Sequence, residues 1–191
     1  MCSRVQLSSL SIFCLSLSLI LSAAIATADQ RDERLDPLFD ALAESDDPQQ
    51  SRALLRDINQ IWVEHPDPEV QQLVLLGSHL LQVGAWREAT GIFEMVTRLA
   101  PDYAEGWNRL ATSLYYRGLN AEALGPTQQT LALEPRHYGA IWGIAMIHRS
   151  LGQEDMARRY FQLAFAIAPG LPEALIQAES SDGPGAPSLA F

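Results

Sequence analysis

A 34-residue repeat constrains this chain more than any other feature of its sequence. Compared with itself at that shift, the sequence divides into three copies, residues 70–103, 104–137 and 138–171. Five columns agree across the copies: Gly84 with Gly118 and Gly152, Pro101 with Pro135 and Pro169, Ala89 with Ala123 and Ala157, Gly77 with Ala111 and Ala145, and Leu76 with Leu110 and Ile144. Such agreement at one period is typical of solenoids, in which each repeat stacks on its neighbours.

Each of these columns has a physical role in a pair of antiparallel helices. The glycine tolerates the left-handed conformation that ends a first helix. The proline ends the second helix, because it lacks a backbone donor and disfavours helical geometry in the residue before it. The small residues let the two helices cross closely. We therefore predict an all-α fold of three helical hairpins, each stabilised mainly by stacking on its neighbours.

The second copy carries a family resemblance. Residues 107–111, with the sequence WNRLA, followed by Gly118, Ala123 and Pro135, resemble the tetratricopeptide repeat (TPR), and the other two copies match at the same columns. The resemblance covers residues 70–171. It implies a right-handed α-solenoid with a concave groove, and it implies no particular ligand.

In this family the groove is lined by the first helix of each pair, which gives a set of candidate partner-binding residues. These are Asn108, Arg109, Thr112, Tyr115, Tyr116, Trp142, Met146 and Arg149. Aromatic residues, methionine and arginine are enriched in protein interfaces, and arginine can bind a carboxylate through two parallel hydrogen bonds. An unidentified protein or peptide partner is therefore expected. The competing interpretation is that Tyr115, Trp142 and Met146 pack against adjacent repeats.

The residues on either side of the repeats extend the helical fold. Leu35 to Ala43 and Gln49 to Glu64 read as two amphipathic helices. Within residues 29–69 they resemble a degenerate hairpin stacked ahead of the first repeat, covering its apolar side. Downstream, residues 172–179 are expected to add a short capping helix, and residues 180–191, rich in glycine and proline, to be a disordered tail.

Residues 1–28 are typical of a signal peptide. Arg4 precedes an apolar stretch from Leu7 to Ile25, and Ala26-Thr27-Ala28 fits a cleavage site. We expect cleavage near Ala28 and a periplasmic mature chain that is not inserted in the membrane. An uncleaved transmembrane anchor is the alternative. Lipid attachment at Cys14 is disfavoured, because Phe13 stands where a lipoprotein signal has a small residue.

Composition excludes several classes of function. All 13 basic residues are arginine, so there is no lysine for a phosphate loop, a Schiff base or a Ser-x-x-Lys pair. Both cysteines lie in the leader, and the four histidines lack metal-ligand spacing. A net charge of -10 disfavours nucleic acid as a partner. The sequence thus predicts no catalytic residues, no metal and no cofactor.

The second repeat departs from its neighbours at Gly125-Pro126, and Thr127 replaces the phenylalanine found at residues 93 and 161. Proline inside a helix costs about 3 kcal/mol or more. We therefore expect the second helix of this repeat to start late or to kink. This would make a weak point in the stack, and the alternative is that it only adjusts the curvature of the solenoid.

Three functions compete at this stage. The first is a periplasmic scaffold or adaptor that holds a partner in its groove. The second is a self-associating structural protein of the cell envelope, in which the apolar end of one solenoid stacks on another. The third is a protein with an unrecognised small-molecule pocket. A repeat scaffold carries little information about pathway.

Overall fold

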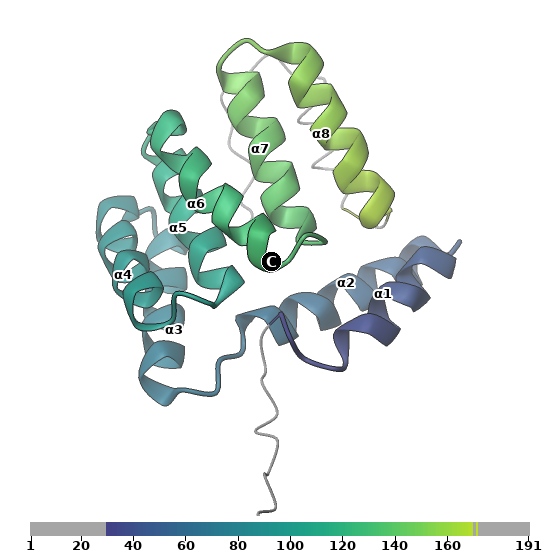
Figure 1. The fold of residues 1–191 in the computed structure, drawn as a ribbon, viewed down its shortest axis with the longest axis horizontal. Helices are drawn as coiled ribbons and strands as arrows, with labels where there is room; N and C mark the ends of the chain where they lie inside the picture. Colours follow the sequence, from purple (N-terminus) through teal and green to yellow (C-terminus); the bar gives the residue numbers. More distant parts are fainter. Residues whose placement is uncertain (1–29, 170, 172–191) are drawn as a thin grey trace, which may run out of the picture.

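The computed structural model describes residues 30–169 and 171, and this part of the chain folds into eight α-helices without strands. They are α1 (Leu35–Glu44), α2 (Pro48–Val63), α3 (Pro68–Gln82), α4 (Trp86–Leu99), α5 (Ala104–Tyr116), α6 (Asn120–Leu133), α7 (Tyr138–Ser150) and α8 (Glu154–Ile167). Helices α3 to α8 form three successive hairpins arranged along a curve (Figure 1). The predicted leader, capping helix and tail lie outside the described residues.

The repeat columns do what the sequence predicts. Gly84, Gly118 and Gly152 end the first helices with φ between 71° and 77°, and each second helix ends two residues before a repeat proline. Close crossing is visible in the first hairpin, where a Cβ atom added to Gly77 would lie 2.6 Å from Cζ of the buried Phe93. The hairpin architecture is therefore confirmed.

Aspartate-proline pairs fix the starts of α2 and α3. The carboxylate of Asp47 accepts the backbone N–H of Gln49 at 2.9 Å, and that of Asp67 accepts the N–H of Glu69 at 2.8 Å. Each aspartate is followed by proline at the first helical position, where a missing N–H costs nothing. The first cap sets where α2 begins, and the second sets where the first helix of the repeats begins.

The expected late start of the second helix in repeat two is wrong. Helix α6 runs without a break from Asn120 to Leu133, through Pro126. The N–H that proline lacks would have bonded the carbonyl of Glu122, which lies on an exposed residue where water can reach it. The weak point inferred from a break at Gly125-Pro126 is not supported.

The position expected for the N-terminal pair is also wrong. Rather than stacking ahead of the first repeat, α1–α2 packs against α7 and α8 in one apolar cluster. The cluster combines Leu35, Phe39, Leu42, Leu55, Ile58, Ile61 and Trp62 with Tyr138, Trp142 and Phe161 among others. Figure 1 shows α1–α2 lying in the hollow of the curve, across from α3 and beneath α7 and α8. The apolar stripe of α2, with Leu55, Ile58, Ile61 and Trp62, is buried in this cluster.

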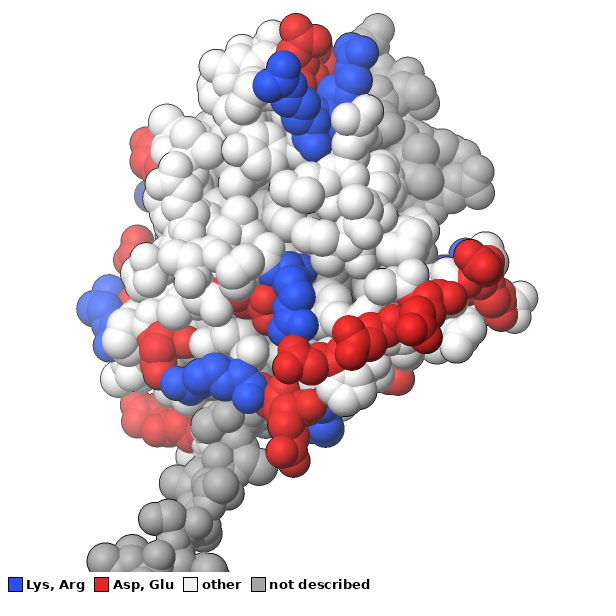
Figure 2. Space-filling view, turned by 45° about the vertical axis from the view of Figure 1, so that its right-hand side comes forward, with Lys and Arg blue, Asp and Glu red and all other residues white. Residues whose placement is uncertain are grey.

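The outer surface of the N-terminal pair is acidic. Glu33, Asp36, Asp40 and Glu44 are all exposed and follow one another at helical spacing. Figure 2 shows this acidic row along the pair, while most of the repeat surface in the same view is uncharged. Among the described residues, no helix is long and apolar enough to cross a membrane.

Candidate partner-binding site on the inner face

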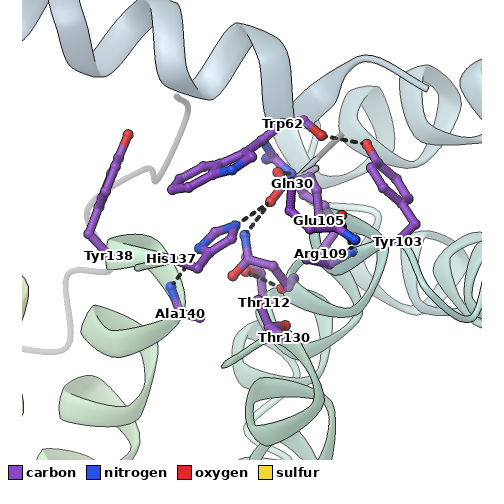
Figure 3. Close-up of polar contacts among 12 residues, drawn as sticks. Gln30, Trp62, Tyr103, Glu105, Arg109, Thr112, Thr130, His137, Tyr138 and Ala140 are labelled. Atoms are coloured by element: carbon purple, nitrogen blue, oxygen red, sulfur yellow. Dashed lines mark hydrogen bonds and ion pairs between the residues drawn. The ribbon is translucent and has the colours of Figure 1, made fainter. Parts of the chain in front are cut away.

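The N-terminal pair divides the inner face of the solenoid into a filled half and an open half. In the filled half, the ring of Trp62 stacks on His137, with centroids 4.1 Å apart and planes 9° from parallel. The backbone carbonyl of Trp62 accepts a 2.8 Å hydrogen bond from the hydroxyl of Tyr103, and Leu55 accepts one of 3.2 Å from Tyr138. Figure 3 shows Trp62 above His137, between Tyr103 and Tyr138. The starts of α5 and α7 are therefore covered by α2.

A second set of contacts, an ion pair and a cation–π contact, attaches α1 to the loop before α7. The guanidinium of Arg136 lies 2.8 Å from Asp36 and 4.3 Å from the ring centre of Phe39. The same guanidinium also contacts the buried carboxylate of Glu134 at 3.2 Å. The N-terminal pair is thus attached through both of its helices, by polar as well as apolar contacts.

A buried polar cluster lies beneath Trp62. The carboxylate of Glu105 accepts hydrogen bonds from Asn108 at 2.8 Å and from Arg109 at 2.5 Å, and lies 3.0 Å from Nε2 of His137. Burial by itself raises the pKa of Glu105, but the charge of Arg109 and the hydrogen bond from His137 outweigh it and lower the pKa to about 2. Glu105 is therefore ionised, and its partners are committed to it.

This cluster corrects one expectation about the groove. Arg109 was chosen as a partner-binding residue of the groove, yet its side chain is 13% exposed and already paired with Glu105. His137 is held as well: its Nδ1 accepts the backbone N–H of Ala140 at 3.1 Å, so we assign the proton to Nε2, facing Glu105. The cluster joins α5 to α7 and is structural. Sequence analysis missed it because Glu105 and His137 lie at opposite ends of the second repeat, 32 positions apart.

The structure separates the remaining candidate residues into core and surface. Trp142 is 1% exposed and packs on Phe161, with ring centres 4.4 Å apart, so its expected place on the groove surface is corrected to the core. Met146 is 5% exposed and packs in the same cluster. Thr112, Tyr115, Tyr116 and Arg149 are half-buried on the open half, and their contact with a partner stays a prediction.

A small slot opens between α5 and α7 in the open half, with a cavity volume of about 30 Å³. It is lined by Asn108, Ala111, Thr112, Tyr115, Thr127, Gly139, Ala140, Gly143, Met146 and Ile147. A Cβ atom added to Gly143 would meet nothing within 4 Å. The volume suits one water molecule or one small aliphatic group, and the lining is apolar apart from Asn108, Tyr115 and the two threonines.

The two glycines of the slot were missed by the sequence-based choice of residues. Gly139 and Gly143 stand one repeat after Glu105 and Arg109, at inner-face positions. They were left out because they bring no side chain. A missing side chain at an inner-face position is itself a signal, because it leaves room for a ligand group.

An aromatic strip leads to the slot from the first repeat. The ring of Trp86, at the start of α4, lies 5.7 Å from that of Tyr116, which lies 6.0 Å from that of Tyr115. Trp86 is 41% exposed. Burial raises the pKa of Tyr115, so its phenol stays protonated and can donate a hydrogen bond. The strip offers rigid apolar area with polar tips, as interface hot spots do.

Helical hairpins of fixed length stacked in a curve define an α-solenoid, and comparison with known proteins names its type. No family model matches the chain. A TPR repeat-containing protein of Rhizobium etli is 27% identical over 137 residues, which span 72% of this chain and 67% of the relative. The repeat columns, the fold and this relative together are those of the tetratricopeptide-repeat type of α-solenoid.

Two solved structures are similar at a level that informs the site. Both are of PcrH, one in complex with the chaperone binding region of PopD and the other with that of PopB. Each has a TM-score of 0.53 and 27% sequence identity. The match covers 59% of this chain and 86% of PcrH in the first complex, and 60% and 94% in the second. PcrH is thus a relative in fold that binds segments of other proteins.

Proposed function

We propose that this protein is a non-catalytic interaction module that holds an extended segment of a partner protein on the open half of its inner face. The slot beside Tyr115 carries the proposal. It lies between the first helices of two repeats and is reached along the aromatic strip. The PcrH complexes support the proposal, because they hold segments of PopD and PopB on a related solenoid.

The chemistry of the open half indicates what such a segment contains. A cavity of about 30 Å³ with apolar walls selects a small aliphatic side chain, such as alanine or valine, over an aromatic one. The strip of Trp86, Tyr116 and Tyr115 offers contact to a neighbouring apolar side chain. Because Arg109 is paired with Glu105, we do not expect Arg109 to bind a terminal carboxylate of the partner.

The test fills the slot from a position where an added Cβ atom meets no neighbour. Gly143→Leu places a side chain in the slot, and Gly91→Leu is the matched control, since a Cβ atom at either glycine meets nothing within 4 Å. A photocrosslinking residue replaces Tyr115 in the native host, with Arg158 on the outer helix α8 as the control position. We expect adducts from residue 115 that persist in Gly91→Leu and disappear in Gly143→Leu. Adducts unaffected by Gly143→Leu would refute the slot as the binding site.

We further propose that the module acts in the periplasm after its leader is removed. The support is the pattern of the first 28 residues, which lie outside the described part of the chain. N-terminal sequencing of the protein from fractionated cells tests this directly. The expected result is a periplasmic chain beginning at Asp29. A full-length chain in the membrane fraction would replace cleavage by the anchor alternative.

A further inference from the structure

Within residues 30–169, the first repeat lacks a cover that the other two repeats have. Leu76 is 46% exposed, whereas its counterparts Leu110 and Ile144 are each 6% exposed. One turn later on α3, His79 is exposed, whereas its counterpart Ser113 is fully buried. The same side of the first helix is therefore buried in repeats two and three and open in repeat one.

The cover in repeats two and three is the second helix of the preceding hairpin. Helix α4 packs so closely on α5 that a Cβ atom added to Gly106 would lie 2.8 Å from Cγ1 of Val96. Gly106 is the counterpart of Gln72 on α3. Because the pair α1–α2 lies in the hollow of the solenoid instead, no described helix takes this place on α3. The repeat geometry thus presents a surface of α3 that is suited to receive a helix.

The exposed residues of α3 form a single stripe with spacings of three and four. They include Glu69, Gln72, Leu75, Leu76, His79 and Gln82. This spacing is that of a seam between two helices. The stripe carries one carboxylate and no arginine, although the chain as a whole has a net charge of -10. Two copies of an acidic protein repel each other, so a nearly uncharged stripe with two exposed leucines at its centre is where they can approach.

The stripe is also complementary to itself when reversed. If two α3 helices run antiparallel about a point between Leu75 and Leu76, these leucines meet their counterparts in the second copy. Gln72 then lies opposite His79 of the second copy, as a hydrogen-bonding pair, and Glu69 lies opposite a glutamine, so no like charges meet. We propose that α3 is a two-fold interface through which a second copy of this chain docks.

The experiment measures the mass of the full chain in solution as a function of concentration. We expect the wild-type mass to double with rising concentration. Leu76→Glu places two carboxylates at the two-fold axis and should weaken association at least about tenfold. Leu163→Glu is the matched control, since Leu163 on α8 is 47% exposed and lies off the stripe. Circular dichroism and thermal unfolding check that each variant keeps its fold.

Charge exchange tests the two-fold arrangement itself. Leu76→Glu and Leu76→Arg should each be monomeric alone, and an equal mixture should recover the doubled mass. A monomeric wild type, a Leu163→Glu variant weakened as much as Leu76→Glu, or a mixture that stays monomeric would each overturn the proposal. The slot lies between α5 and α7, whereas the proposed two-fold interface lies on α3. Loss of crosslinking in Gly143→Leu therefore tests the partner-binding slot, and loss of the dimer in Leu76→Glu separately tests the interface.

Discussion

Replacing Trp62 with alanine should loosen the attachment of the N-terminal pair to the solenoid. Trp62 is 1% exposed, and its ring contacts Phe39, His137 and Tyr138. Burying about 200 Å² of aromatic side chain contributes roughly 5 kcal/mol at about 25 cal/mol per Å². Its indole N–H has no hydrogen-bond partner among the described residues, which offsets about 1–3 kcal/mol of that. The expected loss in the free energy of unfolding is about 3 kcal/mol.

The matched control for this variant is Trp86→Ala. Trp86 is 41% exposed and stacks on Tyr116 alone among the described rings, so its loss should cost about 1 kcal/mol or less. Urea denaturation gives both free energies. Hydrogen exchange shows where protection is lost, which in Trp62→Ala should be α1, α2 and the start of α7. Equal destabilisation by the two variants, or loss of protection spread evenly over all three repeats, would refute the packing argument.

Two further predictions concern the second repeat and its neighbours. The pKa of Glu105 lies at about 2, below its ordinary 4.5, so its contribution to stability is complete above pH 4.5 and is lost as the pH falls toward 2. That loss amounts to about 3 kcal/mol. Between pH 5 and pH 3, the free energy of unfolding of Glu105→Gln should therefore fall less steeply than that of the wild type. Equal slopes for the two proteins would contradict this. Pro126→Ala restores a backbone N–H that can bond the carbonyl of Glu122, so it should stabilise the protein by about 1–2 kcal/mol. Urea denaturation measures this difference. A destabilised variant would show instead that the proline ring is needed for packing.

The hairpins could be predicted from the sequence because each depends on contacts within one repeat. Gly118 and Pro135, for example, bound α6 through local backbone geometry alone. The limits of α1 and α2 were predicted within one residue for the same reason, since amphipathic spacing is local. The place of α1–α2 depends instead on a contact between Trp62 and His137, and no local pattern encodes that contact.

The candidate site was predicted in part. The inner-face positions identified Thr112, Tyr115 and Tyr116 as accessible residues beside the slot. They also selected Trp142, which turns toward Phe161 and leaves the surface. A position in the repeat determines which side of a helix a residue occupies, but the orientation of a large side chain depends on its neighbours. The slot went unseen because its defining residues, Gly139 and Gly143, have no side chains.

The attachment of α1–α2 to the third repeat bears on the order in which the chain folds. A solenoid with neighbour contacts alone can start folding at any repeat and proceed stepwise. Here Leu55 bonds Tyr138 across 83 positions, and Asp36 bonds Arg136 across 100. Helix α2 can contact Tyr103 at the start of α5 earlier, but α1 and α2 bury their apolar cluster only once the start of the last hairpin exists. Long-range closure of this kind slows folding and couples the two ends into one cooperative unit, so that removing the last hairpin would release the first.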